Sequence, residues 1–484
     1  MPDSGPALPL CIDLDGTLTH TDLSVESLLM AIRNAPWIVF LLPAWLIRGK
    51  AHLKSRLSDY ADLDVSVLPY HADVIALVSE ARAEQRRTIL VTGSHQKYAE
   101  QVGRHLGIFD EIMATRADYN LTGANKARAL HERFGDQGFE YIANGTVDLP
   151  VWQLAGASVT VNAPRDVVKK VGLLGRPHKD IPGSPTSART WLKAIRIHQW
   201  AKNALLFVPL ITAHEIQNTA AFFAVFIAFL CFGLCASATY IVNDLFDLES
   251  DRYHARKKKR PFASGAISAK GGIIGAVLLL GSGFGLALML PPAFQLALGA
   301  YIVSTLLYSF RLKKVASLDV LILAGLYTLR VIAGAFAAGI TLSFWLLAFS
   351  MFIFLCLALV KRVAELIELQ KRGANNPSVE IRGREYSTQD IPILQTMGAA
   401  SGYLAVLVLA LYINSAEVLE LYHSPEILWL IAPLLLLWVT RLWIVTTRGY
   451  MDEDPIFFAI KDPETWITAV MTGAILAAAT LVTL

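Results

Sequence analysis

Hydrophobic and polar positions divide the chain into two parts with different patterns. Up to about residue 190, short apolar runs alternate with helical stretches, as at 87–91, 140–142 and 158–161. Beyond that point, apolar runs of roughly 20 residues recur, which is the length that spans a bilayer as a helix. The pattern predicts a soluble head followed by a membrane body.

The head has the pattern of an α/β domain. Residues 8–18 predict a buried strand that ends in a polar loop, and the later strands alternate with helices. Such alternation favours a parallel sheet covered by helices on both faces. We expect the head over 1–175, a linker over 176–190 that contains a Pro/Gly/Ser/Thr cluster, and the transmembrane domain over 191–484.

The apolar segments of the body predict an all-α bundle of about nine spanning helices. They lie at approximately 200–213, 219–241, 270–291, 292–308, 318–339, 342–360, 393–414, 425–446 and 465–484. A further apolar segment, 35–47 in the head, is too short to span. Two interpretations of it stay open: a buried helix of a cap, or an in-plane anchor that holds the head on the membrane.

Lysine and arginine residues gather in the connections on one side of the predicted bundle. They occur around 243–269, 309–317, 361–390 and 447–463, whereas the opposite connections contain none. Basic loops remain on the cytoplasmic side of a membrane. We therefore expect an integral protein of the bacterial inner (plasma) membrane, with a cytoplasmic head and a periplasmic or extracellular C-terminus.

The overall composition agrees with this division. Hydrophobic residues make up 54% of the chain and charged residues 17%, against a usual charged share of about 25%. These shares exclude a disordered or collagen-like chain. The net charge of +3 is too small to indicate nucleic-acid binding, and the four cysteines show no metal or redox spacing.

Two carboxylates follow the first predicted strand. Asp13 and Asp15 flank Leu14, so both should project from the same side of the strand as it ends. Gly16 permits a turn, and Thr17 adds a hydroxyl donor. The carboxyl ends of strands in an open α/β sheet line the ligand crevice. There, one carboxylate can attack phosphorus while the other moves a proton to and from the leaving group.

These residues resemble the haloacid dehalogenase superfamily of aspartate-nucleophile phosphatases. The DxDGT loop is followed by Thr92 at the end of the next strand, by Lys126 in Gly-Ala-Asn-Lys and by Asp148 in Asn-Gly-Thr-Val-Asp. The resemblance implies a Rossmann-like domain with a helical cap, in which Asp13 is the nucleophile and Asp15 the acid/base. It also implies that Thr92 and Lys126 hold the phosphoryl group. The implied Mg²⁺ ligands are Asp13, Asp15 and Asp148.

One position departs from the pattern of that family. The fourth motif often begins with a carboxylate, and Asn144 stands there instead. The carbonyl oxygen of Asn144 can still coordinate a metal ion, but the site loses one negative charge, which lowers the expected Mg²⁺ affinity. The alternative is a retained fold with an inactive or regulatory site.

The strongest signal of the body lies at the end of its second predicted span. Asn243, Asp247 and Asp251 are spaced i, i+4 and i+8, and Asp244 precedes Asp247 by three positions. On a helix these residues form one acidic stripe. Because ionisable clusters at a membrane boundary are costly, the stripe is a candidate functional site. Oxygen ligands of this kind suit Mg²⁺ together with substrate phosphates.

A basic segment, 252–260, follows the stripe directly. Beside a metal site, such a segment can clamp a diphosphate or a sugar phosphate. We expect Arg252 and Arg260 to form this clamp. For Lys257–Lys259 we favour an ordinary basic loop in contact with anionic membrane lipid.

The acidic motif and its flanks resemble the UbiA superfamily of intramembrane prenyltransferases, with its NDxxDxxxD motif and nine-helix bundle. The resemblance covers 190–484 and implies a central cavity, polar at its cytoplasmic mouth and open sideways to lipid. Ordinary members carry a second aspartate-rich motif, but here its place, 308–319, contains Asp319 among several cations. Fewer carboxylates and more cations suit a donor with an additional phosphate. In this respect the chain is similar to the decaprenyl-phosphate phosphoribosyltransferase branch.

That branch implies further phosphate ligands in the body. Arg330 is costly within a span, so it should face the cavity as a phosphate ligand or as the partner of Asp319. The other expected substrate-binding residues are Lys202, Tyr308, Lys313 and Lys361, beside Asn243, Arg252 and Arg260.

The resemblance implies Mg²⁺-dependent transfer of 5-phosphoribose from 5-phosphoribosyl diphosphate to polyprenyl phosphate, with Asp244, Asp247 and Asp251 as the catalytic carboxylates. We expect the head to remove the 5-phosphate, giving polyprenylphosphoryl ribose, a cell-wall precursor. One alternative is an aromatic prenyltransferase that uses polyprenyl diphosphate, beside an independent phosphatase. Another is a phosphatase anchored by an inert bundle. No nucleic-acid partner is expected, and the oligomeric state stays open, a homo-oligomer included.

Overall fold

The computed structural model of the chain describes residues 8–183, 186–372, 384–415, 418, 421–451 and 454–482. The chain folds into two compact units. The first consists of Met1–Arg196 and Tyr240–Leu278, and the second of Ile197–Thr239 and Leu279–Leu484. The first unit therefore combines the predicted head, 1–175, with the predicted linker, 176–190, and the segment that carries the acidic motif. The predicted linker is partly structured, since β6 (His178–Ile181) lies within it.

The head is built on a six-stranded parallel sheet with the strand order β3-β2-β1-β4-β5-β6. The strands are β1 (Leu10–Ile12), β2 (Thr88–His95), β3 (Glu111–Thr115), β4 (Glu140–Ala143), β5 (Ala157–Val161) and β6 (His178–Ile181). In the centre, Ile12 is in register with Leu90 on one side and Ile142 on the other. The predicted α/β class is confirmed. The strand order changes direction between β1 and β4, where such sheets bind ligands.

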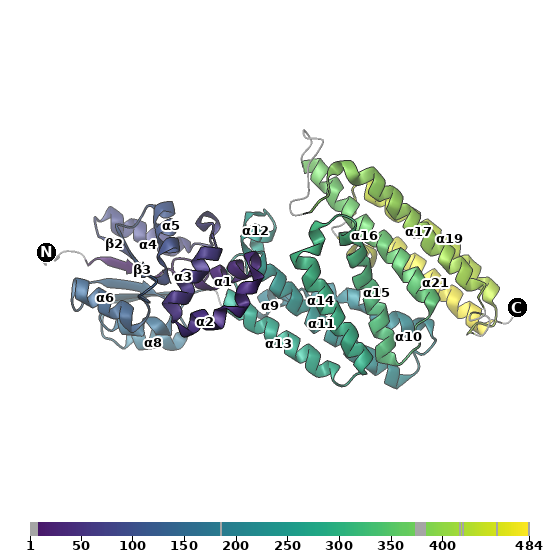
Figure 1. The fold of residues 1–484 in the computed structure, drawn as a ribbon, viewed down its shortest axis with the longest axis horizontal. Coiled ribbons are helices and arrows are strands. Elements are labelled where there is room, and N and C mark those ends of the chain that lie inside the picture. The colour runs from purple at the N-terminus through teal and green to yellow at the C-terminus, as the bar shows by residue number, and fades with distance from the viewer. Residues whose placement is uncertain are drawn as a thin grey trace. The chain divides into compact units, whose positions relative to one another are not determined.

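Helices cover both faces of this sheet (Figure 1). The helices of the head are α1 (Leu23–Asn34), α2 (Leu42–Ile47), α3 (Lys50–Tyr60), α4 (Ala72–Ala83), α5 (Gln96–Leu106), α6 (Ala124–Phe134), α7 (Leu149–Trp152) and α8 (Arg165–Gly172), with α9 (Ala188–Ala194) after the sheet. Of these, α2 packs against α1 and α3. Alternate residues of β1 point to opposite faces. Leu10 and Ile12 pack in one buried cluster with α4 and α5, and Cys11 packs in another with α6, α7 and α8. Two cores therefore hold β1 and the loop after it in place.

The apolar segment 35–47 forms a short 3-10 helix (Pro36–Phe40) followed by α2. Ile38 is fully buried in a cluster with residues of α1 and α3. Phe40 and Ile47, however, are 85% and 87% exposed. These exposures do not fit a fully buried cap helix, and the interpretation as an in-plane anchor stays a prediction.

Among the described residues, eight helices are long and apolar enough to cross a membrane. They are α11 (Thr219–Phe246), α13 (Ala269–Ala287), α14 (Pro292–Phe310), α15 (Leu318–Ala338), α16 (Phe344–Arg372), α17 (Ile391–Ile413), α19 (Ile431–Thr447) together with the 3-10 helix before it (Pro425–Leu430), and α21 (Pro463–Leu481). The predicted helical bundle is confirmed, with eight such helices in place of about nine. The segment 200–213 accounts for the difference. It forms a 3-10 helix (Ile197–Phe207) and the short α10 (Val208–Thr212), and neither is long enough to cross a bilayer by itself.

Small residues let helices of the second unit approach one another closely. Gly398 and Gly402 on α17 face Trp443 and Val439 on α19, so closely that an added Cβ would meet these side chains. Close approach at small residues is a common way for helices to associate in lipid. The packed interior of this unit also contains buried cations, Arg330 on α15 and Arg362 on α16.

Candidate functional site

The acidic motif lies where α11 ends and α12 (Leu248–Tyr253) begins, so the predicted helical stripe is interrupted at Asp247. Asn243 donates from Nδ2 to the carboxylate of Asp247 at 3.2 Å. Asp244 and Asp251 share a different partner, Arg260, whose Nη1 lies 3.1 and 2.7 Å from their oxygens. The stripe is therefore divided into two pairs.

A second arginine, Arg196, joins the same group from the segment after α9. Its Nη2 lies 2.5 Å from Asp244 Oδ1, and its guanidinium lies over the ring of Tyr240 at 5.0 Å from the centroid. Burial raises the pKa of Asp251, and the charge of Arg260 opposes that rise. Carboxylates of the motif, which can hold a metal ion, thus lie beside guanidinium groups from two neighbouring segments, which can bind a diphosphate.

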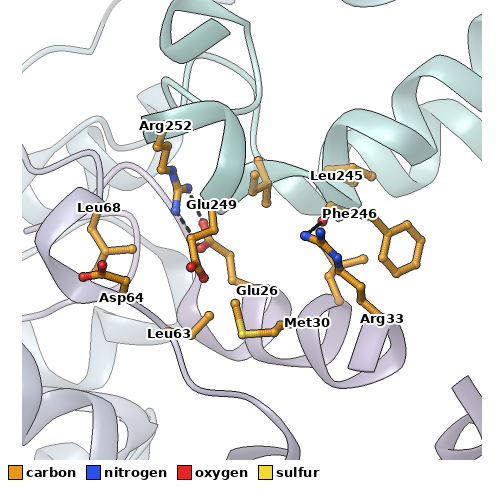
Figure 2. Close-up of a pocket in the computed structure, with 12 residues that line it drawn as sticks. Glu26, Met30, Arg33, Leu63, Asp64, Leu68, Leu245, Phe246, Glu249 and Arg252 are labelled. Carbon is orange, nitrogen blue, oxygen red and sulfur yellow. Dashed lines mark hydrogen bonds and ion pairs between the residues drawn. The ribbon is translucent and has the colours of Figure 1, made fainter. Parts of the chain in front are cut away.

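Arg252, which the sequence assigns to the phosphate clamp, binds the head (Figure 2). Its Nη1 and Nη2 donate to the two carboxylate oxygens of Glu26 on α1, at 2.8 and 2.5 Å. Its Nε donates to the carbonyl of Ala263 at 3.1 Å. In this structure Arg252 is therefore buried and holds a protein carboxylate, whereas the side chain of Arg260 is 28% exposed beside the motif.

The chemistry of these donors fits Mg²⁺, because carboxylate and amide oxygens are its usual protein ligands. The motif supplies three carboxylates and the amide of Asn243. Within the described part of the chain, no group of three or more His, Cys, Asp or Glu side chains converges on one point as a preformed metal cluster. Arginines pair with the carboxylates of Asp244 and Asp251. The site therefore fits an ion accompanied by a phosphorylated ligand that also binds those arginines.

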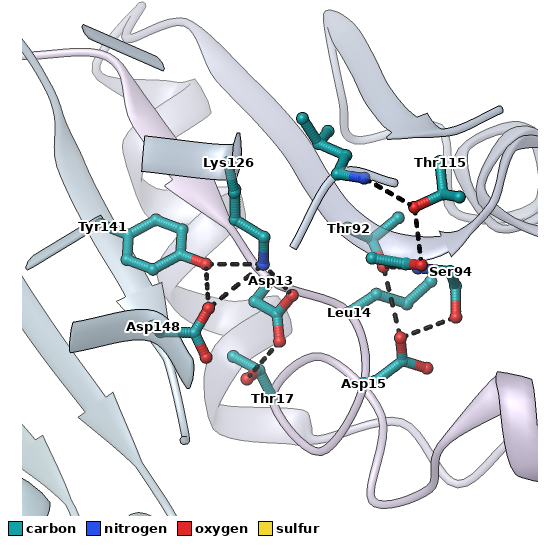
Figure 3. A network of polar contacts seen from close by, with 12 residues as sticks. Asp13, Leu14, Asp15, Thr17, Thr92, Ser94, Thr115, Lys126, Tyr141 and Asp148 are labelled. Atoms are coloured by element: carbon teal, nitrogen blue, oxygen red, sulfur yellow. Dashed lines mark hydrogen bonds and ion pairs between the residues drawn. The ribbon is translucent and has the colours of Figure 1, made fainter. Parts of the chain in front are cut away.

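The second candidate site lies at the carboxyl ends of β1, β2 and β4 (Figure 3). Asp13 directly follows β1, and its backbone N–H donates to the carbonyl of Ile142 at 2.9 Å. One carboxylate oxygen of Asp13 lies 2.7 Å from Lys126 Nζ, and the other accepts from the hydroxyl of Thr17 at 3.3 Å. The sheet and the DxDGT turn together fix this carboxylate.

Lys126 on α6 joins the third and fourth predicted motifs. Its Nζ lies 3.2 Å from Asp148 Oδ1 and 2.8 Å from the hydroxyl of Tyr141, which itself donates to Asp148 at 2.8 Å. Although burial lowers the pKa of Lys126, the charges of Asp13 and Asp148 outweigh burial and raise it above its ordinary value. The site therefore contains a fixed ammonium group, which suits the binding of a phosphoryl group.

Asp15 faces a different wall of the same crevice. It accepts from the hydroxyls of Ser94 at 2.7 Å and Thr92 at 3.4 Å, both on β2. Its other oxygen accepts from the backbone N–H of Leu23, the first residue of α1, at 2.8 Å. The two aspartates of the DxDGT loop thus connect β1 to different neighbours, Asp13 to the third and fourth motifs and Asp15 to β2 and α1.

Burial gives both aspartates unusual acidities. It raises the pKa of Asp13 to about 6, with Lys126 opposing the shift and Asp148 adding to it. It raises the pKa of Asp15 to about 7, and the nearby charges of Asp22 and Asp13 add to that shift. A carboxyl group with a pKa near neutrality exchanges its proton readily at cellular pH, which suits Asp15 to acid/base work.

Asn144 lies against the turn of the DxDGT loop. Gly16 has φ +77°, and an added Cβ there would meet the side-chain amide of Asn144. Of the three predicted Mg²⁺ ligands, Asp13 and Asp148 both contact Lys126, whereas Asp15 faces β2 and α1. The carboxylates of Asp13 and Asp148 and the amide oxygen of Asn144 are donors of the type that Mg²⁺ prefers. The set fits the ion in kind, with one negative charge fewer than a carboxylate at position 144 would give.

Two of the predicted phosphate ligands in the second unit share one carboxylate. Lys202 forms an ion pair with Asp454, and Lys361 Nζ lies 3.9 Å from the same side chain. Although burial raises the pKa of Asp454, the two lysines bring it below its ordinary value. Asp454 lies just before α20 (Pro455–Lys461) and caps its first turn. It thus holds Lys202 and Lys361 near one another.

Arg330 is buried in the interior of the same unit. Its guanidinium donates to Asn203 Oδ1 at 3.1 Å, to the hydroxyl of Tyr301 at 3.0 Å and to the carbonyl of Leu326 at 2.6 Å. The alternative in which Arg330 is the partner of Asp319 is wrong, because another arginine binds that carboxylate. The alternative in which Arg330 contacts a phosphate stays a prediction.

A buried ion pair includes Asp319, the acid in the segment 308–319 where a second aspartate-rich motif would lie. Arg362 Nη2 lies 2.7 Å from Asp319 Oδ2, and both side chains are fully buried. Tyr308, an expected substrate ligand, donates its hydroxyl to Asp319 Oδ1 at 2.8 Å. Lys313 is half-buried in the short turn between α14 and α15. Asp319 and Tyr308 therefore support one another inside the protein.

Comparison with known proteins shows which families the two parts of the chain resemble. Residues 204–480, more than half of the chain, match the UbiA prenyltransferase family. The chain belongs to the UbiA prenyltransferase family. Residues 10–153 match the haloacid dehalogenase-like hydrolases. The UbiA-family protein is thus a bifunctional enzyme with a hydrolase-type head, and its apolar helices make it an integral membrane protein.

Relatives of the UbiA-family protein extend over most of its length. It is 37% identical over 98% of its chain to "Uncharacterized protein y4nM" of Sinorhizobium fredii, covering 90% of that protein. It is 30% identical over 56% of its chain to the decaprenyl-phosphate phosphoribosyltransferase of Mycolicibacterium smegmatis, covering 86% of that enzyme. Among solved structures, a UbiA homologue from Archaeoglobus fulgidus bound to GPP and Mg²⁺ covers 60% of this chain and 97% of its own, with 16% identity and a TM-score of 0.45.

Several side chains that shape the sites of the UbiA-family protein were missed from the sequence. Tyr141 and Ser94 bind the predicted site residues from neighbouring strands, but neither lies at a motif position. Asp454 and Glu26 are single acids in ordinary surroundings of the sequence. Arg196 had a signal, since it is a cation just before the first apolar run of the body.

Proposed function

We propose that this UbiA-family protein transfers 5-phosphoribose from 5-phosphoribosyl diphosphate to a polyprenyl phosphate, and that its head then removes the 5-phosphate. The observation that carries the proposal is the buried Asp319–Arg362 ion pair. It lies where ordinary family members carry a second metal-binding motif. One acidic motif among several cations favours a donor with an additional phosphate. The name of the Mycolicibacterium smegmatis relative supports the same donor and acceptor.

The transfer step needs charge stabilisation more than covalent help. An oxygen of the lipid phosphate forms a bond to ribose C1 while the bond from C1 to the diphosphate breaks, and the electron pair leaves with the diphosphate. Mg²⁺ held by the acidic motif would neutralise that leaving group. Arg196 and Arg260, already beside the carboxylates, stabilise the same negative charge. Lys202 and Lys361 are the candidates for binding the sugar phosphate or the lipid phosphate, which would replace their present partner, the carboxylate of Asp454.

The head is suited to hydrolysis of a phosphate monoester. Asp13 attacks the phosphorus, and Asp15 donates its proton to the sugar oxygen as the P–O bond breaks. Asp15 then takes a proton from the water that releases phosphate from Asp13. Lys126 and Thr92 hold the phosphoryl oxygens, and Mg²⁺ on the oxygen donors of Asp13, Asp148 and Asn144 would offset their charge.

Donor choice tests the proposed transfer directly. Purified protein in lipid nanodiscs is supplied with polyprenyl phosphate and 5-phosphoribosyl diphosphate, or with polyprenyl diphosphate and an aromatic acceptor. We expect mass spectrometry to find a ribosylated lipid phosphate in the first mixture and unchanged reactants in the second. Product in the second mixture alone would establish the aromatic prenyltransferase and refute the proposal.

The exposed apolar segment 35–47 leads to a prediction about the placement of the head. We propose that the head is cytoplasmic and that this segment lies in the membrane interface, because burying Phe40 in lipid removes apolar surface from water. A polarity-sensitive fluorophore on Phe40→Cys, in nanodiscs, should be quenched by lipids with brominated chains. The matched control is Leu173→Cys, since Leu173 is also 85% exposed on the head. The native cysteines are buried, which favours selective labelling. Equal quenching at the two positions would exclude the anchor.

A further inference from the structure

Helix α1 links the hydrolase site to the acidic motif of the transferase. It begins shortly after the DxDGT loop, and the carboxylate of Asp15 accepts from the backbone N–H of Leu23, its first residue, at 2.8 Å. Asp22 caps its first turn by accepting from the N–H groups of Ser24 and Val25. The start of α1 is therefore held by the hydrolase site itself.

The same helix binds the segment 240–278 at three successive places. Asp22 lies 2.6 Å from Lys270, Glu26 binds Arg252, and Arg33 donates to the carbonyl of Phe246 at 2.9 Å. Glu26 and Arg33 are two helical turns apart, so they project from one face of α1. Figure 2 shows both side chains, with Glu26 directed to Arg252 and Arg33 to Phe246.

The Glu26–Arg252 pair is specific and almost fully enclosed. The two side chains are 4% and 5% exposed, and each guanidinium nitrogen has a partner. The hydroxyl of Thr21 donates to Glu26 as well. Because desolvation of two charges is costly, such a pair persists only when its geometry and hydrogen bonds are good. A small cavity of about 30 Å³ lies beside the pair and is lined by residues of both segments.

These contacts hold residues adjacent to the catalytic carboxylates. Arg252 directly follows Asp251, and Arg33 Nη1 lies 3.9 Å from Asp247 in addition to its bond at the last carbonyl of α11. A cation at the carboxyl end of a helix also stabilises that end. The positions of both acids therefore depend on side chains of the head.

We propose that Glu26 and Arg33 of the head are positioning residues of the transferase site, which set Asp251 and Asp247 for binding the donor diphosphate. The inference rests on the proposed function. It makes ribosyl transfer dependent on the presence of the folded head, whether or not the head performs hydrolysis.

The test compares single variants with matched controls in the full-length protein. Glu26→Gln and Arg33→Ala should each raise KM for 5-phosphoribosyl diphosphate by roughly 10-fold or more, since small displacements of binding groups have effects of this size or larger. The controls are Glu80→Gln and Arg128→Ala, which change exposed residues on other helices of the head. We expect the controls to leave KM unchanged.

A double variant separates positioning from stability. Glu26→Gln leaves Arg252 buried and unpaired, which alone destabilises the protein, whereas Glu26→Gln with Arg252→Gln removes both charges. We expect the double variant to recover thermal stability while its KM for the donor stays raised. Recovery of KM along with stability would show a purely structural role and overturn the proposal.

Hydrogen exchange supplies a readout that needs no substrate. Amides of residues 243–262 should exchange faster in Glu26→Gln and Arg33→Ala than in wild type or in the controls. Unchanged exchange there would refute the positioning role. A different outcome is that the wild type fails to ribosylate lipid while the variants still exchange faster. That outcome would refute the proposed function and would still show that α1 stabilises the acidic motif.

Discussion

Asp247→Ala is expected to lower ribosyl transfer by roughly 10²- to 10³-fold, the size of effect found when one group that stabilises developing charge is removed. Asp247 contributes one of three carboxylates in the motif, and its loss weakens the site for Mg²⁺ and hence for the leaving diphosphate. The measurement is the initial rate of lipid ribosylation at saturating lipid phosphate. Hydrolysis of a small phosphate monoester by the head should persist.

Glu249→Gln is the matched control for this variant. It removes one negative charge from the same segment, two positions along, without altering the motif. A general electrostatic effect of the segment would slow both variants equally, whereas a role as metal ligand slows only Asp247→Ala. If Asp247→Ala transfers ribose as fast as wild type, the motif has no part in the chemistry, and the reading of the bundle as a mere anchor gains support.

Asp13→Asn is expected to stop the sequence of reactions after transfer. The lipid product should keep its 5-phosphate, because an amide in place of the nucleophilic carboxylate cannot attack phosphorus, and release of inorganic phosphate should fall by roughly 10³-fold or more. Mass spectrometry of the lipid, with a colorimetric assay of inorganic phosphate, checks both results. The lipid should be heavier than the wild-type product by one phosphoryl group.

Asp118→Asn, an exposed change elsewhere in the head, is the control for this experiment. It should give the dephosphorylated lipid at the wild-type rate. Equal phosphate release by Asp13→Asn and wild type would separate the two activities, and the head would then act on another metabolite or have a regulatory role.

Local sequence patterns revealed the candidate groups for the proposed chemistry. Asp13 and Asp15 lie within one loop, and the acidic motif has helical spacing, so each could be found from a few neighbouring positions. The sheet was predictable for the same reason, because alternation of short apolar runs with helices is a local property. The exposure of segment 35–47 was left open, since its composition suits burial in protein and in lipid equally.

The partners of those groups depend on contacts between distant parts of the chain. Glu26 and Arg252 are 226 positions apart, and no local pattern joins them. The sequence likewise identified Arg330 as a costly buried cation without showing whether Asp319 or other groups compensate it. Pairing of buried charges is decided by packing, so it was available only from the structure.

The enclosed Asp319–Arg362 pair couples the evolution of two positions that lie far apart in the sequence. Replacing Arg362 with an aspartate, as a step toward a second acidic motif, would leave Asp319 isolated in a dry interior at a cost of about 3–5 kcal/mol. Substitution at either position therefore requires a change at the other, or a new counter-ion beforehand. The two positions are therefore expected to change as a pair.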